Sequence, residues 1–564
     1  MAELEAFRRD APPPLPPRPI VIPDARETTL PNGMSVLVIE DDRLPLVSYR
    51  FALKVGTAYD PTKLPGLTDL LAGLLPEGTQ TKSSREIAER VARMGASLNA
   101  GANSDYTIVA ASALAAFQNE ILDLMAEVVL QPSFPEKEVE LAKQNTKESL
   151  RQQRAQPSFL ATEMVSRVVF GNHPYAVVAP TLESIDLFTR EHFVAHHKSK
   201  FAPNNAVLIT VGNVSFDDVL RRVESLFSDW RQGEKLSSDF ASPPERTKRT
   251  AYLVDRPGSA QSNIVLANLA ITRTSPDFFP MLLMHTVLGA TASSRLFMNL
   301  REEKGYTYGA YSNLDARRTA GTFRATAEVR TPVTGDSLKE FFFELDRIRN
   351  EQVSEKEIKD AKSYLTGVFP IRLETQEGMI DQLVQIKMLD LPNDYLQTYR
   401  DRVQAVTVED IQRVARKYVK PDEAAIVVIG DGAKVLDQIK PYCADIEIYN
   451  TSGKRKEMPA AGTEVDITGA WSINIETPLG QTIPATLKIN RADNGTMASI
   501  TSEMGDADFG VIEIQNNSFE ATTPIEMDGH SVEVSIYARF EGEHALGSLT
   551  IQNSPPLPFE GGRE

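Results

Sequence analysis

Residues 289–312 read GATASSRLFMNLREEKGYTYGAYS, and this stretch decides how the rest of the chain is interpreted. Leu296 and Leu300 are four residues apart, the spacing of one helix face, and Gly305 supplies the stop expected just after a helix. Tyr306-Thr307-Tyr308 then favours a strand, because aromatic and β-branched residues suit pleated structure. The stretch therefore predicts a helix, a turn and a strand in succession.

Two polar side chains lie on either side of the predicted turn. Arg301 falls in the last turns of the helix and Tyr308 just past the turn, so the guanidinium and the phenol can point into one space. Both groups donate hydrogen bonds, and arginine keeps its charge at any ordinary pH. Such a pair suits an oxyanion, or a carbonyl that is becoming one. For an isolated pair, an arginine covering a helix end and a tyrosine in a strand is the better explanation, so the surrounding sequence has to decide.

The roughly twenty residues SSRLFMNLREEKGYTYGAYS resemble the second-half signature of the M16 (pitrilysin or insulinase-like) zinc peptidases. In that family an Arg and a Tyr seven residues further on reach over the active site of the first half, and here they match Arg301 and Tyr308. The resemblance covers about residues 25–445. It implies an α+β fold in which two homologous α/β domains face each other like a clam shell, and a non-catalytic Arg/Tyr-bearing subunit of the M16B type.

The resemblance also locates the helix that binds zinc in active members, where it reads His-x-x-Glu-His. Residues 66–79 align with this helix, and the positions of the two histidines and the glutamate are Asp69, Gly73 and Ala72. A catalytic zinc needs three protein ligands, and Ala and Gly have no side-chain atom to offer. One Asp with a distant Glu, such as Glu148, does not suffice. We therefore expect no metal and no other cofactor in this chain.

The histidines offer no better zinc site. His192 and His196 are four apart on one face of a predicted helix, but they lack a third ligand at any expected spacing. They are interpreted as solvated histidines of a surface helix. His173, in the sequence Asn-His-Pro-Tyr, is interpreted as structural.

A candidate peptide-binding strand lies within residues 95–105. In peptidase relatives the matching strand is a sheet edge to which the substrate peptide adds, and the resemblance places Ser97, Leu98, Asn99 and Ala100 there. Strand addition uses backbone groups, so it can survive the loss of the metal. An ordinary strand with small side chains explains the same residues equally well.

An internal repeat supports two homologous halves. Pro203 and Pro421 are 218 residues apart, and so are Gly212 and Gly430 at the ends of the two matching apolar segments. An amphipathic helix is predicted after each segment. The equal spacing of turn, strand and helix predicts two related α+β domains.

The chain changes in character from Val465 onward. Short alternating segments with a turn signal about every ten residues predict an antiparallel barrel or sandwich, and Gly469-Ala-Trp471 resembles the start of a lipocalin-type barrel. Residues 466–564 hold 4 Lys or Arg against 15 Asp or Glu. This acidic module is interpreted either as a docking module for a partner or as a solubilising surface.

These observations divide the chain as follows. The predicted parts are a Pro-rich N-terminal lead (1–24), a first M16-type domain with a degenerate metal site (25–232), a linker (233–249), a second M16-type domain with the Arg/Tyr stretch (250–445), a second linker (451–464) and an acidic all-β domain (465–564).

Composition excludes some classes of function. The net charge of −17 argues against nucleic acid as a partner, since binding phosphates needs a basic face. No run of 18 or more apolar residues is present, so we expect no transmembrane segment. The N-terminal residues have no apolar signal region. We favour a periplasmic protein or one exported in mature form, and leave cytoplasmic and organellar locations open.

The combination of a vacant metal helix and an intact Arg–Tyr pair suggests a function. Within the family it looks like the non-catalytic subunit of a heterodimer or higher assembly, with peptide as substrate and zinc in the partner. Two alternatives stay open. One is a scaffold or assembly protein comparable to the core subunits of respiratory complexes, and the other is a peptide-binding chaperone without a partner.

Overall fold

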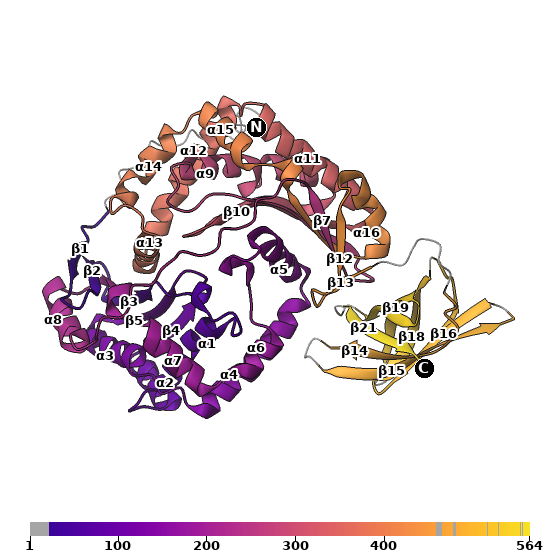
Figure 1. The fold of residues 1–564 in the computed structure, drawn as a ribbon, viewed down its shortest axis with the longest axis horizontal. Coiled ribbons are helices and arrows are strands. Elements are labelled where there is room, and N and C mark those ends of the chain that lie inside the picture. Colours follow the sequence, from indigo (N-terminus) through magenta and orange to yellow (C-terminus); the bar gives the residue numbers. More distant parts are fainter. Residues whose placement is uncertain are drawn as a thin grey trace, which may run out of the picture.

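The computed structural model describes residues 22–457, 465–477, 481–493, 495–515, 517–527, 530–552, 554 and 556–564. Most of the predicted Pro-rich lead, and residues 458–464 of the predicted second linker, lie outside the described residues. Two α/β halves face each other with their sheets on the inner side, and an all-β domain follows beside the second half (Figure 1).

The first half has a six-stranded sheet in the order β1-β2-β6-β3-β5-β4. Its elements are β1 (Arg26–Thr29), β2 (Ser35–Glu40), β3 (Leu46–Leu53), α1 (Leu67–Leu74), α2 (Ser84–Arg93), β4 (Ser97–Ala102), β5 (Thr107–Leu114), α3 (Gln118–Leu130), α4 (Glu136–Arg154), α5 (Pro157–Phe170), α6 (Leu182–Leu187), α7 (Arg190–Lys200), β6 (Ala206–Gly212) and α8 (Phe216–Phe227). Residues 228–249 then lead to the second half without helix or strand.

The second half has a seven-stranded sheet in the order β13-β12-β7-β11-β8-β10-β9. Its elements are β7 (Thr250–Asp255), β8 (Gln261–Leu269), α9 (Phe278–His285), α10 (Arg295–Phe297), β9 (Thr307–Ala316), β10 (Gly321–Arg330), α11 (Thr334–Asn350), α12 (Glu355–Leu373), α13 (Gln376–Met388), α14 (Tyr395–Ala405), α15 (Val408–Tyr418), β11 (Ala425–Gly430), α16 (Gly432–Ile439), β12 (Ile446–Tyr449) and β13 (Arg455–Lys456). β13 falls within the segment 451–464 that was predicted as a linker.

The internal repeat corresponds to the same structure in both halves. Pro203 and Pro421 each begin a short 3-10 turn, because proline tolerates the first helical position, and a fully buried strand follows each turn. β6 pairs in parallel with β2, and β11 pairs in parallel with β7. Helices α8 and α16 follow these strands. The predicted pair of homologous halves is confirmed.

Each half contributes one helix to the sheet of the other. Helix α5 of the first half packs its apolar face, which includes Met164 and Val165, against β7, β8 and β11. Helix α13 of the second half packs against β3 and β6, where Arg50 of β3 pairs with Glu377 and Asp381. The exchange of helices explains why the two halves form one body.

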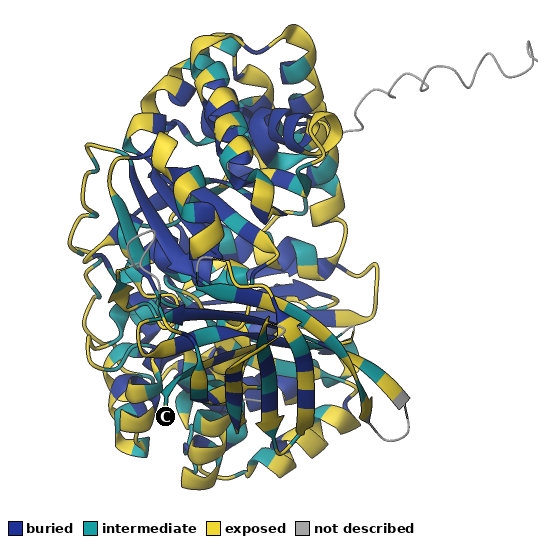
Figure 2. Ribbon diagram, turned by 90° about the vertical axis from the view of Figure 1, so that its right-hand side faces the viewer, coloured by how far each residue is buried: buried dark blue, intermediate teal, exposed yellow. Residues whose placement is uncertain are grey.

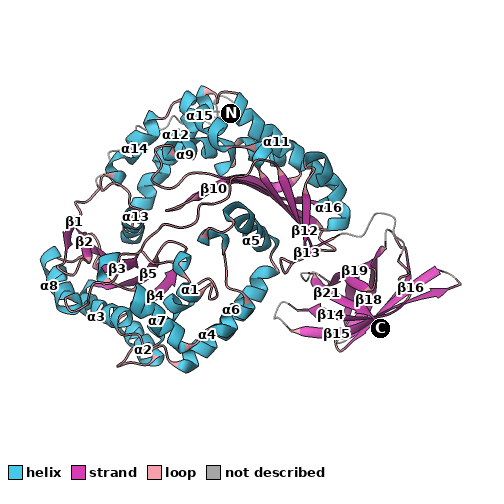
Figure 3. Cartoon of the chain, viewed as in Figure 1, coloured by secondary structure: helices cyan, strands magenta, loops and turns pink. Residues whose placement is uncertain are grey.

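The C-terminal domain is an eight-stranded, nearly closed barrel. Its strands are β14 (Gly469–Glu476), β15 (Thr482–Ala492), β16 (Gly495–Ser502), β17 (Gly505–Ile512), β18 (Ser518–Met527), β19 (His530–Glu541), β20 (His544–Ile551) and β21 (Leu557–Arg563). Each strand pairs with its neighbour in sequence except β17 with β18, and β14 pairs with β21 across the ends of the chain. Figure 3 shows strands without helices here, whereas helices cover both other sheets.

The barrel has its own apolar core. Buried and exposed residues alternate along its strands (Figure 2), as expected for a sheet with one face inward. Trp471 is fully buried, its indole N–H donates to the carbonyl of Ile467 at 2.9 Å, and the Arg563 guanidinium lies 5.1 Å from its ring centre. Because all eight strands belong to one sheet in which β14 pairs with β21, the domain is a barrel rather than a sandwich.

No helix within the described ranges has the length and apolar character needed to cross a membrane.

Candidate functional site

Helix α1 carries the positions that bind zinc in active relatives of the predicted family. Its apolar side, with Leu71 and Leu74, packs into the first-half core, and Ala72 is fully buried as well. Asp69 and Gly73 lie on the exposed side of the helix. A Cβ atom added at Gly73 would meet no heavy atom within 4 Å, so the missing side chain leaves open space rather than a filled core position.

The histidines of α7 do not form a metal site together with α1. His196 is only 5% exposed, and its Nε2 lies 2.9 Å from the hydroxyl of Thr68 on α1. His197 places its Nε2 2.8 Å from the carbonyl oxygen of Val129. The interpretation of His196 as a solvated surface residue is therefore wrong, because α7 packs against α1 and buries that imidazole. Burial lowers the pKa of His196 to about 4, so it is neutral at pH 7.

His173 has a structural position, as the sequence suggested. It is buried, its Nδ1 accepts the backbone N–H of Tyr175 at 3.1 Å, and its Nε2 lies 3.2 Å from the hydroxyl of Thr319. The contact with Thr319 joins the first half to the second.

The candidate peptide-binding strand β4 lies at the end of the first-half sheet and beside α1. Ser97 and Asn99 are exposed, whereas Leu98 and Ala100 are half-buried and pack against the first-half core. Ser97 contacts Ser112 of β5 through their hydroxyls at 2.8 Å. Because β4 ends the sheet, another strand can add along its outer edge, although the backbone of Ala102 already hydrogen-bonds Asp69.

Arg301 lies in a π-helical segment, Met298–Glu303, that continues α10. Its guanidinium lies 5.0 Å from the ring centre of Phe297 and donates to Glu302 at 2.7 Å. Gly305 then ends the segment with a φ of +64°, a backbone conformation that favours glycine. The predicted helix and its glycine stop are present, but the last turns are π-helical rather than α-helical.

Tyr308 is the most exposed of the large aromatic and aliphatic side chains in the described chain, with 89% of its surface accessible. It lies near the start of β9, the edge strand of the second half, where the register with β10 shifts between Ala327 and Val329. Bulges of this kind re-aim a side chain. The next residue, Gly309, is closely packed: a Cβ added there would lie 2.6 Å from the ring of Tyr311.

Buried contacts hold this region in place, and the local sequence did not reveal them. Arg295, 7% exposed, donates from Nε to Glu357 of α12 at 2.7 Å. Burial alone would raise the pKa of Glu357, but the hydrogen bonds from Arg295 and Ser354 outweigh it and lower that pKa to about 2. In the sequence, Ser354 and Glu357 form a capping pattern at the start of α12. That pattern does not indicate that Glu357 also binds Arg295, which is 62 residues before it.

A second contact joins β9 to the end of helix α9. The Nδ1 atom of His285 lies 2.8 Å from the hydroxyl of Ser312, which in turn donates to the His285 carbonyl at 3.1 Å. A Cβ at Gly289 would lie 2.2 Å from the backbone nitrogen of Ser312, so only glycine allows the chain to approach β9 so closely. Arg301 and Tyr308 are thus exposed groups next to closely packed backbone.

Family comparisons identify both halves. The family model described as Insulinase (Peptidase family M16) matches residues 35–179, and the model described as Peptidase M16 inactive domain matches residues 187–365. The chain belongs to the M16 peptidase family. Neither match extends into the barrel.

Several proteins resemble this M16 chain over most of their own length. An uncharacterized zinc protease of Bacillus subtilis is 22% identical over 408 residues, 72% of this chain and 98% of the relative. One of Mycobacterium tuberculosis is 26% identical over 420 residues, 72% and 94% of the two chains. The crystal structure of a peptidase M16 inactive domain from Pseudomonas fluorescens has a TM-score of 0.68 and 27% identity, covering 72% and 98%.

The M16 family implies zinc on α1, but the residues present do not fit it. Ala72 and Gly73 offer no ligand atom, and Glu148 is paired with Arg151. Asp69 is left as the one carboxylate on this helix, and desolvation raises its pKa above the ordinary value. Within the described parts of the chain, no group of three or more His, Cys, Asp or Glu side chains is placed to hold a metal ion.

We expect the purified chain to retain no stoichiometric zinc after dialysis, because α1 offers at most one ligand. Elemental analysis of dialysed protein checks this. The matched control is the double variant D69H/G73H, which places two imidazoles four residues apart on the exposed side of α1 and should retain more zinc than the native chain. One tightly held zinc per native chain would contradict the prediction.

Proposed function

We propose that this chain is the non-catalytic subunit, of the M16B type, in a heteromeric M16 zinc peptidase. A zinc-bearing partner would supply the metal site that α1 lacks. This chain would supply Arg301 and Tyr308, together with the peptide-binding edge of β4 at Ser97–Ala100.

The exposure of Tyr308 carries the proposal. A phenol that is 89% exposed contributes little to the stability of its own chain, yet the bulge and the contacts behind β9 fix its backbone. An exposed donor on a strand that is packed closely on its other side suits a site that a second protein completes. Arg301 is likewise exposed, and its nearest anionic partner is the neighbouring Glu302.

The chemistry assigned to this chain is hydrogen-bond donation. As a peptide bond is attacked, its carbonyl oxygen gains negative charge, and preorganised donors stabilise that charge more than they stabilise the starting carbonyl. The guanidinium of Arg301 and the hydroxyl of Tyr308 can both donate to such an oxygen. An extended peptide on the edge of β4 would be held by backbone hydrogen bonds, with side chains alternating to either side.

The proposal predicts that a second M16 chain accompanies this one. Purification of a tagged chain from its native source should yield a stoichiometric partner whose sequence contains His-x-x-Glu-His, and peptidase activity should require both chains. Activity of the partner alone at the level of the complex, with a normal complex formed, would favour the scaffold function instead. Recovery of this chain without any M16 partner, but with bound peptides, would favour the chaperone.

A further inference from the structure

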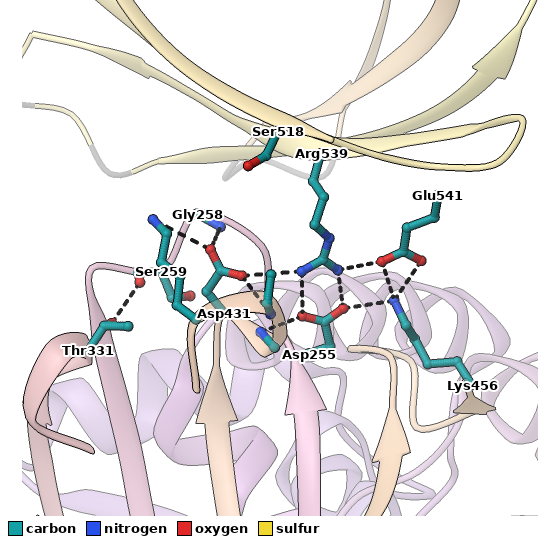
Figure 4. Close-up of polar contacts among 12 residues, drawn as sticks. Asp255, Gly258, Ser259, Thr331, Asp431, Lys456, Ser518, Arg539 and Glu541 are labelled. Atoms are coloured by element: carbon teal, nitrogen blue, oxygen red, sulfur yellow. Dashed lines mark hydrogen bonds and ion pairs between the residues drawn. The ribbon is translucent and has the colours of Figure 1, made fainter. Parts of the chain in front are cut away.

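The barrel contacts the second half at the carboxyl ends of β7 and β11. Strand β19 lies over these ends, and Arg539 extends from it toward Asp255 and Asp431 (Figure 4). All three side chains are buried, with 4%, 1% and 0% of their surfaces exposed. A buried arginine between two buried carboxylates indicates a specific contact, because charges leave water only when they are paired.

The guanidinium is bound on several sides. Its Nη1 lies 3.3 Å from Oδ1 of Asp255 and 3.2 Å from Oδ1 of Asp431. Its Nη2 pairs with Oδ2 of Asp255 and lies 2.7 Å from Oε1 of Glu541, the next outward residue on β19. Lys456 of β13 makes a second ionic contact between the second half and the barrel. Its Nζ lies 2.7 Å from Asp255 of the second half and 3.1 Å from Glu541 of the barrel.

Backbone groups of the second half hold the two carboxylates in place. The N–H of Gly432, the first residue of α16, donates to Asp255 at 2.8 Å. The N–H groups of Ala433 and Gly258 donate to Asp431 at 3.2 and 3.1 Å. These donors belong to the second half and not to the barrel, so the acidic site is built independently of Arg539.

The first half contains a related arrangement with one carboxylate and no barrel, because Asn213 follows Gly212 where Asp431 follows Gly430. Glu40 occupies the position of Asp255, since it ends β2 and pairs with Gly212 in the same parallel register. It accepts the N–H of Phe216, the first residue of α8, at 2.7 Å. Its cation is Arg26 of the same half, at 3.9 Å, and both side chains are about half exposed. In the second half the carboxylates at this position are buried, and Arg539 of the barrel pairs with them in addition to Lys456 and Lys434 of the second half itself.

Packing and charge both require the barrel to sit close. A Cβ at Gly258 would lie 2.6 Å from the Ser548 hydroxyl and 3.0 Å from the ring of Tyr537, so only glycine allows this approach. Burial alone would raise the pKa of Asp255, but the charges of Arg539 and Lys456 outweigh it and hold that pKa below its usual range. Without Arg539, the cations left beside the buried carboxylates would be Lys434 and Lys456, whose side chains are 45% and 19% exposed.

We infer that the carboxyl ends of β7 and β11 form a guanidinium-binding site, that Arg539 of the barrel is its ligand, and that this contact fixes the barrel in one position on the second half. The barrel is then a permanent part of the surface of this chain rather than a module on a tether. The inference is independent of the proposed peptidase function.

The test asks whether the barrel stays bound to the second half once the peptide link between them has been cut. A site-specific protease sequence is inserted between residues 457 and 465 of the full-length chain, and the folded protein is cleaved. The two pieces of the native chain should co-elute in size-exclusion chromatography at micromolar concentration. Arg539→Met should raise their dissociation constant about 100-fold or more, because it leaves two buried carboxylates under-compensated. Arg539→Lys should give an intermediate loss, since it keeps the charge but not the planar fork.

Two controls keep folding apart from docking. Trp471 is fully buried in the barrel core, so its blue-shifted emission, measured in a Trp230→Phe background, reports whether the barrel stays folded. Arg491→Met removes an exposed arginine of the same barrel and should leave the dissociation constant within about twofold of native.

A compensating variant tests the charge pairing directly. Adding Asp255→Asn to Arg539→Met removes one buried charge but keeps an oxygen acceptor for Gly432, so the pieces should bind more tightly than with Arg539→Met alone. The inference is overturned if the cleaved native pieces separate at once, or if Arg539→Met leaves their affinity unchanged while Trp471 stays buried. Equal losses in the single and the double variant would also overturn it.

Discussion

Replacing Tyr308 by Phe is expected to lower kcat of the proposed two-chain peptidase by about 10²–10³, the usual loss for one oxyanion donor. The change removes only a hydroxyl from a side chain that is already 89% exposed, so the fold of β9 and the association of the chains should be unchanged. The loss should fall on kcat rather than KM, because the donor meets charge that exists only in the transition state. Steady-state kinetics of the reconstituted complex, at equal complex concentration, measures it.

The same strand offers a matched control. Tyr311 is 44% exposed and packs over Gly309 and beside Phe297, so Tyr311→Phe should keep kcat within about twofold. Arg301→Lys is the companion variant, since it keeps the charge and loses the planar fork. If Tyr308→Phe also leaves kcat within a factor of about two in an intact complex, the pair is structural and the scaffold function takes precedence.

Acid is expected to destabilise the chain well above the range in which carboxylates titrate. Burial lowers the pKa values of both His196 and His285 to about 4, from an ordinary value of 6.5. A neutral buried imidazole stabilises the fold fully above the unfolded pKa, and that stability is lost as pH falls from about 6.5 toward 4. At about 1.4 kcal/mol per pH unit, each imidazole accounts for about 3–4 kcal/mol over the whole range. Thermal or urea unfolding at pH 7.5, 6 and 5 measures the loss.

Substitution of these two histidines should flatten the pH dependence. His196→Gln keeps a polar atom near the Nε2 contact to Thr68, and His285→Asn does the same for the Nδ1 contact to Ser312. Each variant should lose less stability than the native chain between pH 7.5 and 5, whatever its stability at pH 7.5. His544→Gln, an exposed position at the start of β20, is the control and should follow the native curve. Parallel curves for all four proteins would refute the assignment to these imidazoles.

The local sequence predicted the secondary structure of the region around Arg301 and Tyr308, but not its detailed geometry. The helix, its end at Gly305 and the strand that starts near Tyr308 follow from spacing and residue type, which act between neighbours. The π-helical geometry, the bulge and the exposure of Tyr308 were not predictable in this way. They occur beside contacts between residues far apart in the chain, such as Arg295 with Glu357 and Gly289 with Ser312, which neighbouring residues do not reveal.

The histidines of α7 show where pattern analysis predicted exposure that the fold does not have. His192 and His196 share a helix face in the sequence, and both were interpreted as solvated. Whether a helix face meets water depends on its neighbour, and α1 covers His196 through Thr68. Spacing along one helix cannot reveal such a neighbour.

The sequence by itself determined which side chains exist to do chemistry, and that two related halves precede an all-β domain. Ala72 and Gly73 deprive α1 of ligand atoms in any fold, the repeat around Pro203 and Pro421 specifies two related halves, and period-two alternation specifies a final all-β domain, barrel or sandwich. Only the tertiary structure decided which surfaces meet: α5 and α13 cross to the opposite sheets, and Arg539 enters the acidic strand ends of the second half. The reason is physical. Secondary structure follows from short-range sterics and periodic burial, whereas a buried ion pair or an exchanged helix gains its free energy only when distant segments exclude water together.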